Sequence, residues 1–196
     1  MDNLIVLNDD LIIGKGLHRT CYRHPDTYNL CIKINHKKDS QEQIRELSYY
    51  EHLNNRNIPW DLLTRYHGIV HTNMGAGYAF DLVIDSDNQP SKTLEYYLNE
   101  SALKGIASSL LKLKAYLMQN SIITKELWPR NIACVNNNGI IESCVIVDDI
   151  GNTEFIPIST YFRIPAKNKI NRKWKRFEDR LSELGLPPSN LRAGVD

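Results

Sequence analysis

The chain has 196 residues, of which 42% are hydrophobic, and its 24 basic and 23 acidic side chains give a formal net charge of +1. This length suits a single domain, and the near-neutral charge argues against nucleic acid or a membrane surface as the main partner. No apolar run approaches the roughly 18 residues of a membrane-spanning helix, and Asp9 and Asp10 interrupt the N-terminal apolar residues too early for a signal peptide. The four cysteines form no C-x-x-C pair and the six histidines have no metal-binding spacing. We therefore expect free thiols in a reducing cytoplasm and no zinc site.

The first 85 residues are predicted to consist mainly of strands. Apolar runs predict strands at 4–13, 21–22, 30–34, 66–71 and 78–84. A glycine loop at 14–16 separates the first two strands, and the glycines at 75–77 predict a turn between the last two. Apolar residues at helical spacing predict one helix over 41–56, with Ser40 as a candidate N-cap.

The second half of the chain is predicted to be led by helices. A polar, breaker-rich linker occupies 85–90 and is followed by further elements: helices at 93–98 and 101–119, strands at 132–135 and 144–147, and a terminal helix within 163–180. We therefore expect one α+β domain over 1–196. It would have a strand-rich N-lobe at about 1–85 and a reduced helical C-lobe at 91–196, with a cleft between them.

The glycine loop is a candidate phosphate-binding element. It reads Gly14-Lys15-Gly16-Leu17-His18-Arg19. Glycines let backbone N–H groups approach phosphate oxygens closely, and the cationic side chains of Lys15 and Arg19 favour the same ligand. Arg19 stands where a full G-x-G-x-x-G pattern has its third glycine, so the loop alone is also compatible with an ordinary strand-turn-strand.

A lysine and a glutamate follow this loop in a distinctive order. Lys33 lies on the strand at 30–34, and Glu46 lies in the next helix between Ile44 and Leu47. A glutamate near the apolar stripe of a helix needs a charged partner, and Lys33 is the natural one; Glu42, one turn earlier, is the competing candidate. A glycine loop, a strand lysine and a helix glutamate in this order form the ATP site of protein kinases.

The segment after the long helix is similar to the kinase catalytic loop H-R-D-L-K-P-x-N. It reads Thr124-Lys125-Glu126-Leu127-Trp128-Pro129-Arg130-Asn131. Asn131 matches the metal-binding asparagine, whereas Glu126 replaces the catalytic aspartate and Trp128 replaces the lysine. Glutamate can act as a general base, but it is one methylene longer, and errors of about 1 Å can cost on the order of a hundredfold in rate. We therefore expect slow catalysis.

A third motif offers two candidate metal ligands. An apolar strand ends in Asp148-Asp149-Ile150-Gly151, where kinases place the magnesium-binding D-F-G. Asp149 matches that tripeptide literally, but Asp148 follows the strand directly and is slightly favoured. Both carboxylates could contact Mg²⁺, which prefers oxygen ligands. The alternative is a pair of aspartates that caps a turn.

Together these motifs resemble the YrbL-type PhoP regulatory network proteins of bacteria, which belong to the protein-kinase-like superfamily. The resemblance covers nearly the whole chain and is carried by several segments: Gly14–Tyr22, Cys31–Lys33, Arg45–Tyr50, Tyr66–Gly68, Gly75–Tyr78, Leu127–Ile132 and Asp148–Gly151. It implies a minimal two-lobed kinase-like fold in a bacterial cytoplasm and says little about the substrate. Only residues 152–196 follow the last motif, which leaves no A-P-E sequence and too little chain for a full C-lobe.

The tail between residues 163 and 180 carries eight basic and two acidic side chains. Trp174 and Phe177 share one helical face, which suggests a terminal helix docked on the C-lobe with its basic face in solvent. Contact with nucleic acid, or with an acidic or regulatory protein partner, is the alternative. The expected function is an ATP- and Mg²⁺-binding kinase-like protein with slow phosphotransfer to an unknown acceptor. The alternatives are a pseudokinase-like module that binds a nucleotide or a partner without catalysis and, distantly, a nucleic-acid-binding protein.

Overall fold

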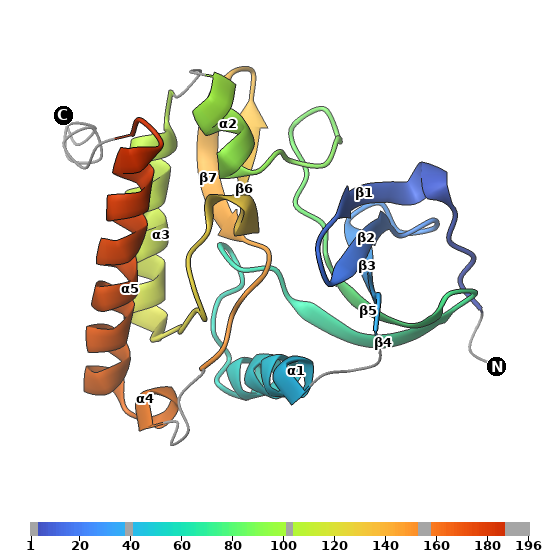
Figure 1. The fold of residues 1–196 in the computed structure, drawn as a ribbon, viewed down its shortest axis with the longest axis horizontal. Coiled ribbons are helices and arrows are strands. Elements are labelled where there is room, and N and C mark those ends of the chain that lie inside the picture. The colour runs from blue at the N-terminus through green and yellow to red at the C-terminus, as the bar shows by residue number, and fades with distance from the viewer. Residues whose placement is uncertain (1–3, 38–40, 101–103, 153–157, 187–196) are drawn as a thin grey trace.

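The computed structural model describes residues 4–37, 41–100, 104–152 and 158–186. It has two lobes (Figure 1), as the sequence predicts. The N-lobe is an antiparallel sheet of order β1-β2-β3-β5-β4 with one helix beside it. Its elements are β1 (Ile12–Lys15), β2 (Arg19–Arg23), β3 (Leu30–Asn35), α1 (Gln41–Asn55), β4 (Tyr66–Thr72) and β5 (Gly75–Asp81). The N-cap expected at residue 40 lies outside the described residues.

Strand β3 separates the small N-lobe core from the cleft. It pairs with β2 so that Lys33 lies opposite Cys21. Side chains alternate across a strand, and Ile32 and Ile34 therefore pack with Tyr22 in the N-lobe core. Lys33 points to the other side, into the space between the lobes, as predicted.

The turn expected at 75–77 is wrong. Strand β4 ends at Thr72 and β5 starts at Gly75, so Asn73 and Met74 form the turn and the glycines lie in the strand. A Cβ on Gly77 would lie 2.5 Å from Cγ2 of Ile32. The glycine is therefore needed for close packing rather than for a turn.

The buried face of helix α1 includes a charged residue. Tyr49, Tyr50 and Leu53 are buried, and Glu46 shares their face with only 2% of its surface exposed. These positions have the i, i+3, i+4, i+7 spacing of one helix face. Ile44 lies off this face and is 52% exposed, so the charged residue and not the isoleucine faces the protein interior.

The described residues of the C-lobe form four α-helices and a two-stranded hairpin. Its elements are α2 (Leu94–Glu100), α3 (Ile106–Asn120), β6 (Ile132–Asn137), β7 (Ile140–Ile146), α4 (Ile158–Tyr161) and α5 (Arg163–Glu183), with a 3-10 turn at Pro129–Asn131 before β6. Helix α3 begins at Ile106, later than predicted. Gly105 precedes it with a φ of +86°, and a Cβ there would lie 2.2 Å from the carbonyl oxygen of Ile141.

Helix α5 lies alongside α3 (Figure 1) and closes the C-lobe. Trp174, Phe177 and Leu181 are each at most 1% exposed, which confirms the predicted docking of the terminal helix. In the described part of the chain, no helix is both long and apolar enough to cross a membrane.

Candidate functional site

A cleft of about 1650 Å³ lies between the two lobes. It brings together residues that are up to 139 positions apart in the sequence, from Asp10 to Asp149. Nine of the ten predicted site residues line it: Gly14, Lys15, Gly16, Arg19, Lys33, Glu46, Asn131, Asp148 and Asp149. The tenth predicted site residue, Glu126, is not among the described residues that line the cleft.

Lys33 crosses the cleft from the N-lobe to the C-lobe. Its Nζ donates a hydrogen bond to the carbonyl oxygen of Val147 at 2.6 Å and lies 3.7 Å from Oδ1 of Asp148. It also lies 4.4 Å from the centre of the Phe80 ring, at a distance where a cation is attracted to an aromatic face. Only 7% of the side chain is exposed. Lys33 is therefore a buried charge at the point where the lobes meet.

Glu46 is held by cations other than the one expected. Its carboxylate accepts hydrogen bonds from Lys125 Nζ at 2.9 Å and from Arg19 Nη2 at 3.4 Å. Among the ion pairs of the described residues there is none between Lys33 and Glu46, so the expected pair is wrong. A buried carboxylate needs compensating charge, and Arg19 and Lys125 supply it. The side chain of Glu42, the competing candidate, lies outside what the structure describes.

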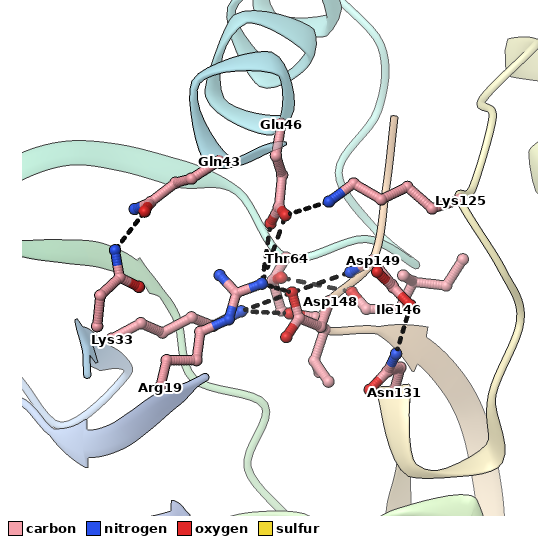
Figure 2. Close-up of polar contacts among 12 residues, drawn as sticks. Arg19, Lys33, Gln43, Glu46, Thr64, Lys125, Asn131, Ile146, Asp148 and Asp149 are labelled. Atoms are coloured by element: carbon pink, nitrogen blue, oxygen red, sulfur yellow. Dashed lines mark hydrogen bonds and ion pairs between the residues drawn. The ribbon is translucent and has the colours of Figure 1, made fainter. Parts of the chain in front are cut away.

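Arg19 occupies the centre of this network. Its Nη2 donates a hydrogen bond to Oδ1 of Asp148 at 2.7 Å, and Figure 2 shows the guanidinium between Glu46 and Asp148. Burial by itself would raise the pKa of Asp148, but the charges of Lys33 and Arg19 outweigh it and lower that pKa. Asp148 is therefore an ionised carboxylate held by two cations from the N-lobe.

Asp149 has different partners from its neighbour. Asn131 Nδ2 donates a hydrogen bond to Asp149 Oδ2 at 3.2 Å. Burial, and then the charge of Asp148, raise the pKa of Asp149. Its φ is +67°, a backbone conformation that is uncommon outside glycine and is enriched at functional sites.

Asp149 and Asn131 could together hold a divalent cation. Mg²⁺ typically takes one or two carboxylates and completes its shell with water and the oxygens of substrate phosphates. No group of three His, Cys, Asp or Glu side chains suited to a metal is found among the described residues. A cation here would therefore complete its shell with water or with the oxygens of a bound phosphate.

Glu126 faces helix α5 and not the cleft. It does not belong to the described residues that line the cleft. Its carboxylate pairs with Lys173 Nζ at 2.8 Å and lies 3.9 Å from Arg180 Nη2. The neighbouring Trp128 ring lies 3.5 Å from the guanidinium carbon of Arg180 and 4.7 Å from that of Arg130. The expected general base is thus engaged by the terminal helix.

The basic tail is less free than the sequence suggests. Lys169 is buried and hydrogen-bonds to Asn152, and Lys173 and Arg180 reach the segment around Glu126. The exposed basic residues of α5 are Arg163, Arg172, Lys175 and Arg176. Three of the eight basic residues of this segment therefore contact other parts of the molecule.

Sequence reasoning missed the roles of Lys125 and Lys173. Lys125 connects the catalytic-loop segment to Glu46, and its backbone N–H also bonds the carbonyl oxygen of Asp149 at 2.7 Å. Its place in the motif was visible, but the partner 79 positions away was not. Lys173 gave no local signal, because its contact depends on how α5 packs.

The five-stranded sheet, helix α1 beside it and the cleft define a protein-kinase-like fold. The chain is similar to a solved structure of the protein kinase Rad53 in complex with AMP-PNP, with a TM-score of 0.52 and 15% identity. The match covers 71% of this chain and 37% of that chain, so this chain spans well under half of Rad53 as crystallised. At this identity the likeness shows the fold alone.

The family follows from closer relatives. Residues 5–182 match the family model described as PhoP regulatory network protein YrbL. The chain is 38% identical over 183 residues to the uncharacterized YrbL proteins of Escherichia coli and Shigella flexneri, covering 89% of this chain and 86% of each relative. The chain belongs to the YrbL family, as the motifs predict.

Proposed function

We propose that this protein binds ATP with Mg²⁺ in the cleft between its lobes. The observation that carries the proposal is the buried Lys33 ammonium, which faces the cleft and meets the C-lobe at Asp148. A lysine is seldom buried unless it is paired. Here the burial fixes the ammonium of Lys33 in the lining of the cleft that Gly14 and Gly16 also line. The AMP-PNP in the Rad53 structure, on the same fold, supports this choice of ligand.

The residues around Lys33 suit the parts of a nucleotide triphosphate. Gly14 and Gly16 carry no side chains, so a phosphate can approach the backbone of this segment closely, although the N–H of Gly16 itself bonds the carbonyl oxygen of Arg19. Lys33 would pair with the inner phosphates. Asp149 and Asn131 would hold Mg²⁺, with Asp148 as a further carboxylate ligand, and the bound ion would neutralise phosphate charge.

Phosphotransfer, if it occurs, should be slow. A general base must lie within hydrogen-bond reach of the proton that it accepts. Glu126 pairs with Lys173 outside the cleft lining, so its carboxylate would have to leave that pair before it could meet an acceptor hydroxyl. This geometry favours nucleotide binding with weak or no turnover, and it gives weight to the pseudokinase-like alternative.

Incubation of the purified protein with γ-labelled ATP and Mg²⁺ tests the proposal. Free phosphate, labelled protein and bound ATP are separated and counted. We expect bound ATP in clear excess over both products. A failure to bind ATP at millimolar concentration would contradict the proposal, and rapid hydrolysis or labelling would contradict the slow-turnover part of it.

A further inference from the structure

Arg19 stands at the third glycine position of the loop motif. Its charged side chain reaches Asp148, a candidate metal ligand in the cleft. The backbone N–H of Gly16 bonds the carbonyl oxygen of Arg19 at 2.9 Å, which closes a tight turn and fixes where the arginine leaves the backbone. Its guanidinium then lies 2.7 Å from Asp148 and 3.4 Å from Glu46. The arginine side chain is 23% exposed, so it can leave this place without crossing the protein core.

The network around Arg19 is already balanced in charge. Three cations, Arg19, Lys33 and Lys125, face the carboxylates Glu46, Asp148 and Asp149. Arg19 contacts Oδ1 of Asp148, so a divalent cation on either oxygen of this carboxylate lies close to the guanidinium. Mg²⁺ binds oxygen at about 2.0–2.1 Å, and two positive groups on one carboxylate repel each other at such short separations.

We propose that Arg19 is an internal counter-cation that competes with the divalent metal for Asp148 and so sets the metal dependence of nucleotide binding; the nucleotide half of this statement rests on the proposed function. Without metal, Arg19 neutralises Asp148 and Glu46. When metal occupies Asp148, the guanidinium is released at the base of the glycine loop. There it can pair with phosphate, for which a guanidinium has a well-matched donor geometry.

Removal of Arg19 leaves the rest of the network intact. Glu46 keeps Lys125 at 2.9 Å, and Asp148 keeps Lys33 at 3.7 Å. The Arg19→Gln variant should therefore fold, and thermal unfolding checks this. Arg19→Lys retains a charge at the same place. Arg45→Gln is the matched control, because Arg45 is exposed on α1 beside Glu46 and does not line the cleft.

The first measurement is Mn²⁺ binding to the nucleotide-free protein, followed by electron paramagnetic resonance. We expect Arg19→Gln to bind Mn²⁺ about tenfold more tightly than the wild type, within the usual range of coupling between two ligands. Arg45→Gln should behave like the wild type, and Arg19→Lys should lie between the wild type and Arg19→Gln. Equal Mn²⁺ affinity in wild type and folded Arg19→Gln, or no Mn²⁺ binding by either, would overturn the proposal.

The second measurement is calorimetric titration with ATP, once with excess EDTA and once with Mg²⁺. The ratio of the two affinities should be about tenfold larger in Arg19→Gln than in the wild type. Tighter Mn²⁺ binding by the variant together with no ATP binding by any protein would reject the proposed function and keep the role of Arg19. ATP binding with an unchanged ratio and unchanged Mn²⁺ affinity would reject the role of Arg19 and keep the proposed function.

Discussion

Replacement of Lys33 by methionine tests the binding site at its most buried charge. Methionine keeps most of the apolar stem beside the Phe80 ring, so the change removes the ammonium with little loss of packing. Asp148 retains its 2.7 Å hydrogen bond from Arg19. The carbonyl oxygen of Val147 loses its 2.6 Å donor, which costs on the order of 1–3 kcal/mol of folding free energy for a buried unsatisfied group. We expect a folded but less stable protein.

The effect on ATP affinity follows from the bond that is lost. A hydrogen bond to a charged group contributes about 1.5–3 kcal/mol, and each 1.36 kcal/mol is a factor of ten. Lys33→Met should therefore weaken ATP·Mg²⁺ binding by about 10- to 150-fold. Lys112→Met is the matched control, because Lys112 is exposed on α3 and lies outside the cleft lining.

Calorimetric titration with ATP and Mg²⁺ measures this change, and urea unfolding shows that each variant is folded. The control should bind ATP like the wild type. A folded Lys33→Met protein with wild-type affinity and wild-type turnover would remove Lys33 from the site and refute the reasoning about its burial.

Three further predictions address the remaining groups. Glu126→Gln should abolish any residual phosphotransfer and leave ATP affinity unchanged; phosphotransfer that persists in the variant would show that this carboxylate is not the base. Asp149→Asn should weaken Mn²⁺ binding more than Asp148→Asn, because Asp149 lies beside an amide whereas Asp148 is already paired with cations; a larger effect of Asp148→Asn in the same titration would reverse the assignment. Burial, and then the charge of Arg56, lower the pKa of His52. Its neutral form is therefore favoured in the folded state, and its contribution to stability is present above about pH 6.5 and is lost as the pH falls below that value. Urea unfolding at pH 7.5 and 5.5 should give a larger loss of stability in the wild type than in His52→Gln, and equal losses would count against the shift.

The elements that the sequence predicted correctly have strong local signals. The strand around Lys33 alternates, α1 has helical spacing, and the tail carries Trp174 and Phe177 at i, i+3. Each of these signals depends only on the periodicity of the local backbone, and the structure confirms all three elements. The order of the motifs was enough to predict the kinase-like fold, because the lobes and the cleft follow from the order of the elements.

The errors concern partners that are distant in sequence. The turn at 75–77 is misplaced because Gly77 is needed for close packing against Ile32, a residue on another strand. The expected pair of Lys33 and Glu46 follows from their positions on the strand and the next helix. In the structure Arg19 and Lys125 form the ion pairs with the Glu46 carboxylate instead. A sequence shows which residues are charged, whereas the partner of a buried charge depends on packing across the whole fold.

The ion pairs of Glu126 with α5 also join residues that are distant in the sequence. Nothing near Glu126 in the sequence indicates that Lys173 and Arg180 will lie beside it. The tail looked like a free basic surface because its amphipathic pattern separates apolar from polar residues. That pattern cannot separate lysines in solvent from lysines that reach over the edge of the helix to a neighbouring segment.

A crystal structure of the wild-type protein grown with AMP-PNP and Mn²⁺ tests the central claim most directly. We expect the nucleotide between the lobes, with phosphate oxygens within hydrogen-bond distance of Lys33 and of the turn that follows β1. Anomalous scattering from Mn²⁺ should place the metal on Asp149 and Asn131, with Asp148 as a further ligand. An empty cleft in crystals grown at saturating nucleotide, or a nucleotide bound away from Lys33, would contradict it.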